Sequence, residues 1–319
     1  MDEVLAAEEL RKRYGDVVAL DGVSLSVSAG EVFALIGPNG AGKTTLVRAF
    51  TGTTTPSGGR ATVFGEKPST VARSRLGLLP QDFNPPARLT GRELVRYYAG
   101  LYDHSQSVDA VLDSVGMIDD ADTWYETLSG GQQRRIAVGT ALVNDPDVLF
   151  LDEPTTGIDP AGRRRIWALL EELAAAGTTI FLTTHDMEEA TALADRVGIL
   201  VDGRIVESGR PVELIRRYGG ESRLVVEADE PVRGDAFAGT EHPVSIENRE
   251  IVFHAIEPTD IGAAVAALER AGITYEELTW RQPSLEDVYL SVTGESYDPR
   301  QQHTERSASD STVPTGGAR

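Results

Sequence analysis

The sequence predicts an α/β domain with a largely parallel sheet and a helical insertion, followed by a smaller α+β domain. Three observations lead to this fold class. Apolar runs of strand length alternate with helical patterns, a mainly helical stretch lies between about residues 84 and 127, and the composition changes near Tyr218-Gly219-Gly220. We therefore place one domain over residues 1–218, a second over 221–294, and a polar tail over 295–319 that we expect to be disordered.

The first domain is predicted to begin with short strands and turns over residues 1–30, because apolar and polar residues alternate there. In the insertion, Thr90 and Glu93 fit a capping box at the start of a helix, and we interpret the pair Tyr97-Tyr98 as core. Further strands and helices are predicted in alternation at 31–36, 44–50, 148–151, 161–175, 178–183 and 187–190.

The second domain has fewer and shorter elements. We predict a strand over 223–226, a pair of strands around 244–256, a helix over 261–270, a strand over 275–280 and a helix over 284–292. About 75 residues of this pattern are typical of a small α+β domain.

Composition excludes several classes of protein. The 319 residues include no cysteine, so disulfide scaffolds, thiolate metal sites and cysteine nucleophiles are excluded. Nothing at the N-terminus resembles a secretory signal, and no apolar run is long enough for a membrane span, so we expect a cytoplasmic location. The net charge of −20 would repel phosphate backbones, which argues against nucleic acid as the main partner.

The basic residues are unevenly divided, because only Lys12, Lys43 and Lys67 are lysines. A large acidic excess with few lysines favours a host with a salty, halophile-like cytoplasm. An arginine-rich composition from a GC-rich genome is the alternative interpretation.

A phosphate-binding loop is predicted directly after the strand at 31–36. The segment Gly37-Pro-Asn-Gly-Ala-Gly-Lys43-Thr44 matches the pattern G-x-x-x-x-G-K-[ST]. Glycines let backbone N–H groups turn toward a phosphate, Lys43 reaches the β- and γ-phosphates, and the Thr44 hydroxyl is a ligand for Mg²⁺. A nucleotide triphosphate site is therefore expected.

Two adjacent carboxylates, Asp152 and Glu153, follow the apolar strand at 148–151. Taken alone, such a pair is more often a solvated turn. With the phosphate loop present, Asp152 is predicted to hold Mg²⁺ and Glu153 to polarise the water that attacks the γ-phosphate.

A second segment suited to phosphate, Leu128-Ser129-Gly130-Gly131-Gln132, lies between these two motifs and opens a helix. One chain is expected to bind one nucleotide and therefore one γ-phosphate, but its sequence contains two loops suited to a phosphate. A two-fold dimer, in which this second loop of each chain contacts the nucleotide of the partner, accounts for both loops.

The order and spacing of these motifs resemble the ATP-binding subunit of an ABC transporter, over about residues 5–214. The resemblance implies that Tyr14 stacks on adenine, that Gln81 senses Mg²⁺ and contacts the membrane partner, and that Asp159 lies at the dimer seam. It also implies that His185 contacts the γ-phosphate, so the expected catalytic residues are Glu153, His185 and Lys43. The expected metal ligands are Thr44, Gln81 and Asp152, with no metal beyond Mg²⁺. The expected nucleotide-contacting residues are Tyr14, Gly37, Pro38, Asn39, Gly40, Ala41, Gly42, Lys43, Thr44, Thr45, Gln81, Ser129, Gly130, Gly131, Gln132, Asp159 and His185.

The segment 283–294, Pro-Ser-Leu-Glu-Asp-Val-Tyr-Leu-Ser-Val-Thr-Gly, is similar to the ending of drug-resistance subunits of the daunorubicin-exporter type. Those subunits pair with ABC-2 permeases. The resemblance therefore implies an ATPase that drives export as a homodimer, held at the cytoplasmic face of the membrane by its permease. The alternative is a soluble ABC-type ATPase with a regulatory or non-transport role, and the cargo is left open.

Overall fold

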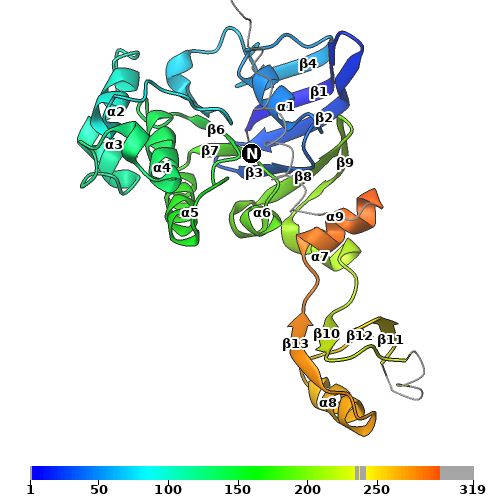
Figure 1. The fold of residues 1–319 in the computed structure, drawn as a ribbon. Coiled ribbons are helices and arrows are strands. Elements are labelled where there is room, and N and C mark those ends of the chain that lie inside the picture. Colours follow the sequence, from blue (N-terminus) through cyan, green and yellow to red (C-terminus); the bar gives the residue numbers. More distant parts are fainter. Residues whose placement is uncertain (1, 234–236, 238–241, 295–319) are drawn as a thin grey trace, which may run out of the picture. The chain divides into compact units, whose positions relative to one another are not determined.

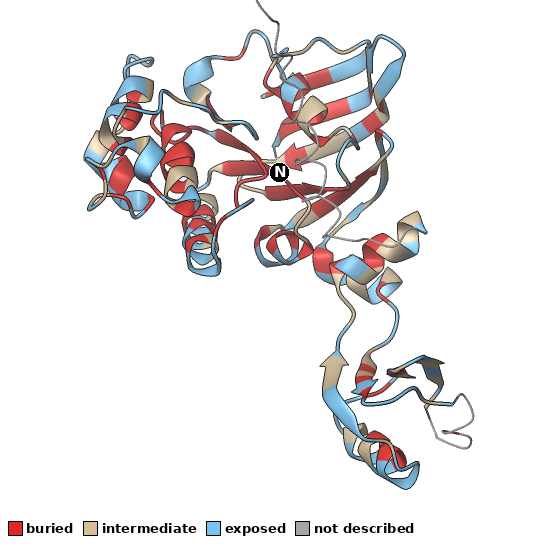
Figure 2. Ribbon diagram, in the orientation of Figure 1, coloured by how far each residue is buried: buried red, intermediate tan, exposed pale blue. Residues whose placement is uncertain are grey.

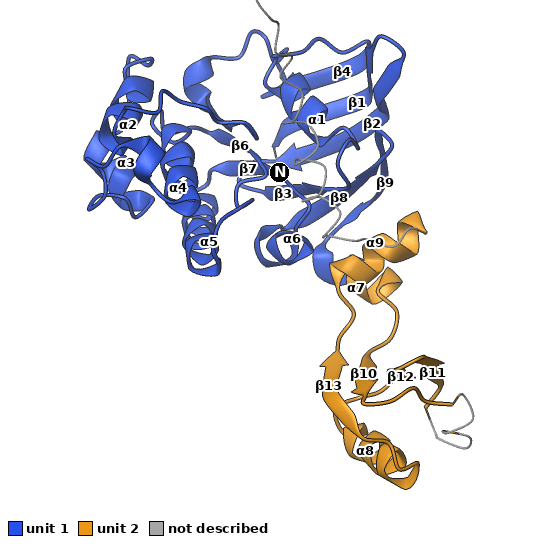
Figure 3. Cartoon of the chain, viewed as in Figure 1, with its two compact units in different colours: residues 1–214 blue, residues 215–319 orange. Residues whose placement is uncertain are grey.

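The computed structural model describes residues 2–233, 237 and 242–294 (Figure 1). The chain forms two compact units, residues 1–214 and 215–319 (Figure 3). The division falls within helix α7 (Pro211–Tyr218), a few residues before the predicted change at Tyr218-Gly219-Gly220. The tail predicted over 295–319 lies outside the described residues.

The first unit contains the predicted, largely parallel sheet. Its six strands have the order β5-β6-β7-β3-β8-β9, and only β9 runs antiparallel to its neighbour. Their bounds are β3 (Val32–Ile36), β5 (Leu76–Leu79), β6 (Val148–Asp152), β7 (Thr179–Thr184), β8 (Arg196–Val201) and β9 (Arg204–Gly209). The α/β fold class predicted for this part is confirmed.

A second, antiparallel sheet of the first unit has the order β2-β1-β4. Strands β1 (Glu3–Tyr14) and β2 (Val17–Ser28) have 12 residues each and pair with one another, while β4 (Gly58–Val63) pairs with β1. The prediction of short strands here was wrong. Register shifts, one of them beside Glu9 with its positive φ of 46°, interrupt the alternation and hide the length of the strands.

Aromatic side chains join the parallel sheet to helix α1 (Lys43–Phe50), and strands β3, β6 and β7 of this sheet are buried along their whole length (Figure 2). Phe50 of α1 packs on Phe150 and Phe181, with ring centroids 6.4 and 5.6 Å apart, and Phe33 stacks on Phe181 at 5.5 Å. Such pairs add to the free energy of burial and fix the helix on the sheet. This packing holds the C-terminal end of α1 against the sheet.

The predicted helical insertion contains α2 (Gly91–Ala99) and α3 (Val108–Ser114), and α4 (Gly130–Thr140) follows it. The capping box at α2 is present, because the Thr90 N–H donates to Glu93 Oε2 at 2.9 Å and the Glu93 N–H donates to Thr90 Oγ1 at 3.2 Å. The interpretation of Tyr97 as core was wrong: it is 61% exposed, because α2 turns Leu94 and Val95 inward instead. Helices α5 (Pro160–Ala175) and α6 (Met187–Leu193) complete the unit.

The second unit is a small α+β fold. Its antiparallel sheet has the order β11-β12-β10-β13, and residues of α8 share a core with β10 and β12. The bounds are β10 (Arg223–Ala228), β11 (Val244–Glu247), β12 (Glu250–His254), α8 (Ile261–Arg270), β13 (Tyr275–Arg281) and α9 (Leu285–Thr293). Across the part of the chain that the structure describes, every helix is too short or too polar to cross a membrane.

Candidate active site

Three neighbouring strands carry the predicted motifs to one edge of the parallel sheet (Figure 1). Parallel pairing of β6, β7 and β3 sets Asp152 beside Thr183 and Ile36 beside Thr184. Because the carboxyl ends of parallel strands meet at the same edge, the segments that follow them lie together. These segments begin at Gly37 and Glu153 and include His185.

The phosphate-binding loop connects β3 to α1, and two of its glycines have φ values that favour glycine. Gly40 and Gly42 have φ of 80° and 108°. A Cβ on Gly42 would lie 2.3 Å from the carbonyl oxygen of Ala19, which no side chain can tolerate. Gly42 also precedes the first residue of α1, whose free N–H groups attract anions. The loop is therefore shaped by its sequence for close approach to a phosphate.

Lys43 is buried, with 6% of its surface exposed. Its ammonium donates to the carbonyl oxygens of Gly37 and Pro38 at 2.7 and 3.1 Å. Burial lowers the pKa of Lys43, and the negative charges of Glu153 and Asp152 partly offset this effect. The lysine thus lies between the loop and the two carboxylates, as an anion-binding role requires.

The two carboxylates differ in their surroundings although both are buried. Asp152 accepts a hydrogen bond from the Thr183 hydroxyl of β7. The Glu153 N–H donates to the carbonyl oxygen of Thr183 at 3.0 Å, and Glu153 Oε2 accepts from the Thr156 hydroxyl at 3.2 Å. Thr183 is therefore a supporting residue that the motif analysis did not identify, since nothing in the sequence shows which strand adjoins β6.

His185 follows β7 and lies beside Glu153, with His185 Nδ1 3.4 Å from Glu153 Oε1. Burial acts to raise the pKa of Glu153. The hydrogen bond and charge of His185, the charge of Lys43 and the Thr156 hydroxyl outweigh it and hold this pKa below its ordinary value. Glu153 is consequently ionised at neutral pH and able to accept a proton.

A cavity of about 180 Å³ opens over the phosphate-binding loop. It brings together residues from four segments of the first unit, including Gln81 after β5 and Glu153 after β6. Its lining consists of Val17, Val18, Ala19, Pro38, Asn39, Gly40, Gly42, Lys43, Thr44, Thr45, Gln81 and Glu153. Gly37 and Ala41 belong to the loop but do not line the cavity. The carbonyl oxygen of Ala41 accepts a hydrogen bond from the Gly203 N–H.

Tyr14 lies beside α1 and not in the lining of this cavity. Its ring is 45% exposed, Lys12 Nζ lies 4.8 Å from the ring centroid, and its hydroxyl donates to Thr54 Oγ1 at 3.5 Å. Val17 and Val18, 67% and 42% exposed, do line the cavity, and the motif analysis missed them. Their position three and four residues after Tyr14, just past a turn, was the available signal.

The glycine-rich turn at 129–132 lies apart from the cavity lining of its own chain. Ser129 caps α4, and its N–H donates to Gln132 Oε1 at 2.9 Å while its hydroxyl accepts from the Gln132 N–H at 3.3 Å. A Cβ on Gly131 would lie 3.0 Å from Asp159 Oδ1, so this turn packs closely against the loop that starts α5. Asp159 in turn caps α5. Residues 129–132 and Asp159 therefore form a second group, separate from the phosphate-binding loop.

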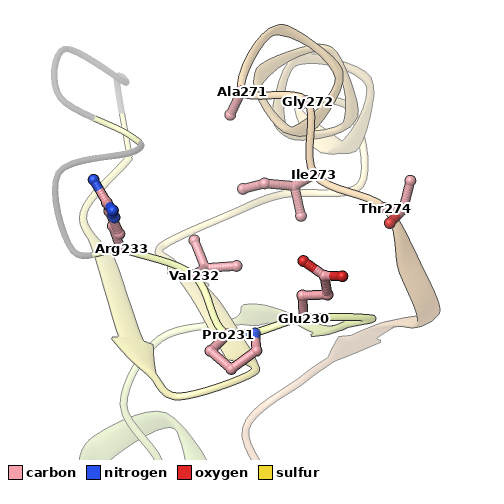
Figure 4. Close-up of a pocket in the computed structure, with 8 residues that line it drawn as sticks. All are labelled: Glu230, Pro231, Val232, Arg233, Ala271, Gly272, Ile273 and Thr274. Atoms are coloured by element: carbon pink, nitrogen blue, oxygen red, sulfur yellow. The ribbon is translucent and has the colours of Figure 1, made fainter.

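Another pocket, of about 320 Å³, lies in the second unit between the segment after β10 and the turn before β13 (Figure 4). Apolar side chains of Val232 and Ile273 lie near one carboxylate, Glu230, and one hydroxyl, Thr274. No residue of the predicted motifs lines it. All of the predicted site residues therefore lie in the first unit.

The arrangement at the cavity combines groups that bind a polyphosphate with a base. The loop N–H groups and Lys43 are chemically suited to an anion, and the carboxylate of Glu153 is chemically suited to accept a proton from water. Thr44, with its hydroxyl, and Gln81, with its amide, line the same cavity. These are the groups needed for hydrolysis of a nucleoside triphosphate.

Residues 20–156 match the family model described as ABC transporter. The chain is 38% identical over 304 residues to the Nod factor export ATP-binding protein I of Cupriavidus metallidurans, covering 92% of this chain and 98% of that protein. It is 36% identical over 306 residues to the daunorubicin resistance ATP-binding protein DrrA3 of Streptomyces coeruleorubidus, with 92% and 97% covered. Both alignments extend through the second unit.

Solved structures agree with the fold of the first unit. A bacterial ABC transporter cassette solved as a dimer has a TM-score of 0.59 at 27% identity, covering 65% of this chain and 98% of that one. An ATP-binding cassette of an ABC transporter in its ADP conformation has a TM-score of 0.60 at 26% identity, covering 68% and 95%. The cassette fold, the binding of nucleotide and the dimeric form are thus found together in proteins similar to this chain.

Proposed function

This chain belongs to the ATP-binding subunits of ABC transporters, and on that premise we propose that it drives export through permeases of the ABC-2 type. The observation that carries the proposal is the cavity in which Lys43 and Glu153 converge on one phosphate-binding loop. Similarity over 92% of the chain to an export and a drug-resistance ATP-binding protein supports the direction of transport. ATP hydrolysis supplies the energy, and the membrane subunits are its partners.

The nucleotide is proposed to lie across the start of α1. Lys43 and the loop N–H groups would bind its β- and γ-phosphates, while the exposed ring of Tyr14 offers a face for adenine. Thr44, Gln81 and Asp152 supply a hydroxyl, an amide and a carboxylate oxygen, which are the hard donors that Mg²⁺ prefers. Mg²⁺ bound there would neutralise charge on the phosphates.

In hydrolysis, Glu153 is proposed to accept a proton from water while the water oxygen bonds to the γ-phosphorus and ADP leaves. The carboxylate is ionised at neutral pH, as this role requires. His185, 3.4 Å from Glu153, would orient the carboxylate and contact the γ-phosphate. These side chains are therefore proposed to position the water and to accept its proton, without forming a covalent bond to the phosphate.

The second group of residues, 129–132 with Asp159, is proposed to complete the site of another copy of the chain. These residues do not line the cavity of their own chain, and their helix N-terminus is suited to a phosphate. A two-fold dimer would place each turn on the partner's nucleotide. Closure of the dimer around two ATP molecules and its reopening after hydrolysis would then provide the motion that drives transport.

That motion is proposed to reach the permease through the Gln81 loop and α2. Phe83, two residues after Gln81, lies 5.8 Å from the ring of Tyr98, which lies 5.5 Å from that of Tyr97. Tyr97 and nearby Leu101 are 61% and 62% exposed, an apolar surface suited to a helix of a membrane subunit. This contact would hold the chain at the cytoplasmic face of the membrane.

Affinity purification of the tagged chain from detergent-solubilised membranes tests the proposal. We expect a polytopic permease to co-purify and to stimulate ATP hydrolysis. Tyr97→Asp should lose the permease but keep the hydrolysis of the free chain. Val212→Asp, at a 76% exposed valine of α7, is the matched control and should keep both. Recovery of an active ATPase without any polytopic partner would contradict the transport role.

A further inference from the structure

Arg134, in the first turns of α4, donates hydrogen bonds to five backbone carbonyl oxygens outside its own helix. Three belong to the consecutive residues Asp152, Glu153 and Pro154, at 2.7, 2.7 and 3.0 Å. The other two belong to Pro80 and Gln81, at 3.3 and 3.5 Å. One guanidinium thus joins the glycine-rich helix, the end of β6 and the loop after β5.

The backbone that Arg134 contacts has an unusual conformation at its centre. Glu153 has a φ of 52°, in the left-handed region that side chains other than glycine seldom adopt. Such a conformation persists only where the surroundings enforce it. The carbonyls of the residue before it, of Glu153 and of the residue after it all accept bonds from the same guanidinium, so Arg134 is positioned to enforce this turn.

We propose that Arg134 is a positioning residue for hydrolysis: it holds the backbone of Glu153 in the conformation that aims its carboxylate at the water. The inference rests on the proposed function, in which Glu153 is the base. The hydrogen bonds from Arg134 to residues of the cavity lining go to the backbone oxygens of Gln81 and Glu153. It acts through Glu153 and is not itself a catalytic residue.

A consequence concerns coupling between the two sites of a dimer. Ser129 and its glycines, assigned above to the partner's nucleotide, begin the same helix that carries Arg134. A shift of this helix, or of the Gln81 loop that faces the permease, would move the guanidinium and with it the turn at Glu153. Hydrolysis would then depend on the engagement of both loops.

The neighbouring residue provides a matched control. Arg135 is buried, at 9% exposure, and its guanidinium, like that of Arg134, donates to backbone carbonyls, those of Val115 at 3.3 Å and Gly116 at 2.6 Å. These acceptors belong to the segment that ends α3 and lie outside the cavity lining. Lysine keeps the charge at either position, but a single ammonium cannot reproduce the planar fan of five N–H groups.

The first experiment compares Arg134→Lys with Arg135→Lys in the full-length chain. Steady-state hydrolysis gives kcat, a fluorescent ATP analogue gives nucleotide affinity, and thermal melting gives stability. We expect Arg134→Lys to lower kcat at least tenfold with nucleotide affinity within threefold of wild type. Arg135→Lys should keep kcat within about twofold despite a similar loss of melting temperature. Equal effects on kcat would overturn the proposal, whereas an inactive wild-type chain would overturn the proposed function instead.

A second experiment does not require hydrolysis. Arg134→Lys is combined with Glu153→Gly and, separately, with Glu153→Gln, and melting temperatures are measured. Glycine adopts positive φ without strain, whereas glutamine does not. If Arg134 enforces the turn, its substitution should lower the melting temperature less in the glycine background than in the glutamine background. Equal losses in the two backgrounds would show that Arg134 only packs, and would overturn the inference.

Discussion

Glu153→Gln should nearly abolish ATP hydrolysis while leaving ATP bound. The substitution keeps the size of the side chain and an acceptor for the Thr156 hydroxyl, which lies 3.2 Å from Glu153 Oε2, but an amide cannot accept the proton of the attacking water. A positioned general base contributes about 10²- to 10⁴-fold to a rate. The expected loss of kcat is of that size, or about 2.7 to 5.5 kcal/mol on the activation barrier.

The same substitution should not weaken nucleotide binding. Glu153 lines the cavity beside Lys43 and is ionised, since its pKa is held below the ordinary value. A carboxylate near the anionic phosphates opposes their binding by an amount on the order of 1 kcal/mol, as two like unit charges about 4 Å apart do in water. Removing that charge should leave ATP affinity unchanged or raise it by up to about tenfold.

Three measurements decide this prediction: single-turnover hydrolysis, binding of a fluorescent ATP analogue, and sizing chromatography with ATP at low Mg²⁺. The variant should accumulate as a closed dimer with ATP. Glu189→Gln is the control, because Glu189 is a buried acid of α6 that does not line the cavity, and its kcat should stay within about threefold. A kcat for Glu153→Gln within tenfold of wild type, or a marked loss of ATP affinity, would refute the assignment of Glu153 as the base. A variant that stays monomeric at high ATP would count against shared sites.

Ser129→Arg should stop hydrolysis with little change in the ATP affinity of the monomer, unlike Lys43→Ala, which should lose affinity outright; equal losses of monomer affinity would exclude action on the partner's nucleotide. Burial raises the pKa of Glu189, although hydrogen bonds from its neighbours act to lower it. Above the ordinary pKa of a glutamate, the unfolded chain has lost this proton while the folded state keeps it. Wild-type stability therefore falls as pH rises from the ordinary pKa toward the raised pKa of the folded state. The melting temperature of Glu189→Gln relative to wild type should therefore increase between pH 5 and pH 8, and a difference independent of pH would contradict this. With a net charge of −20, the melting temperature and ATP-driven dimerisation should both rise between about 0.1 and 2 M KCl, where the screening length falls from roughly 10 Å to less than 3 Å. An activity maximum at low salt would refute the salt-adapted interpretation.

Local sequence was sufficient for the elements whose geometry depends on near neighbours. The capping box predicted at Thr90 requires residues only three positions apart, and the structure contains it, as it contains the helix predicted to open at Ser129. The phosphate-binding loop is equally local, because two of its positions with a positive φ angle, Gly40 and Gly42, are glycines in the sequence. The apolar strand before each motif predicted the parallel sheet, since such runs are buried on both faces.

The register shifts of β1 and the exposed face of α2 could not be predicted from local sequence. The length of β1 was hidden by irregular pairing with β2, which includes bonds across the hairpin such as the one that the Glu9 N–H donates to Ser24 Oγ, 15 positions away. Tyr97 has a helical apolar spacing that suits a core residue, but the packing of α2 on its neighbours turns it outward. An apolar pattern identifies a helix face without deciding what covers that face.

Tertiary structure alone decided which distant groups meet at the cavity. Strand order places β7 between β6 and β3, and this brings His185 to within 3.4 Å of Glu153, a residue 32 positions earlier. The five carbonyls around Arg134 and the left-handed turn at Glu153 also arise only once β5, β6 and α4 are packed together. The physical reason is that side-chain type and spacing prescribe local backbone geometry, whereas contacts across a sheet depend on the order of its strands, which no short motif encodes.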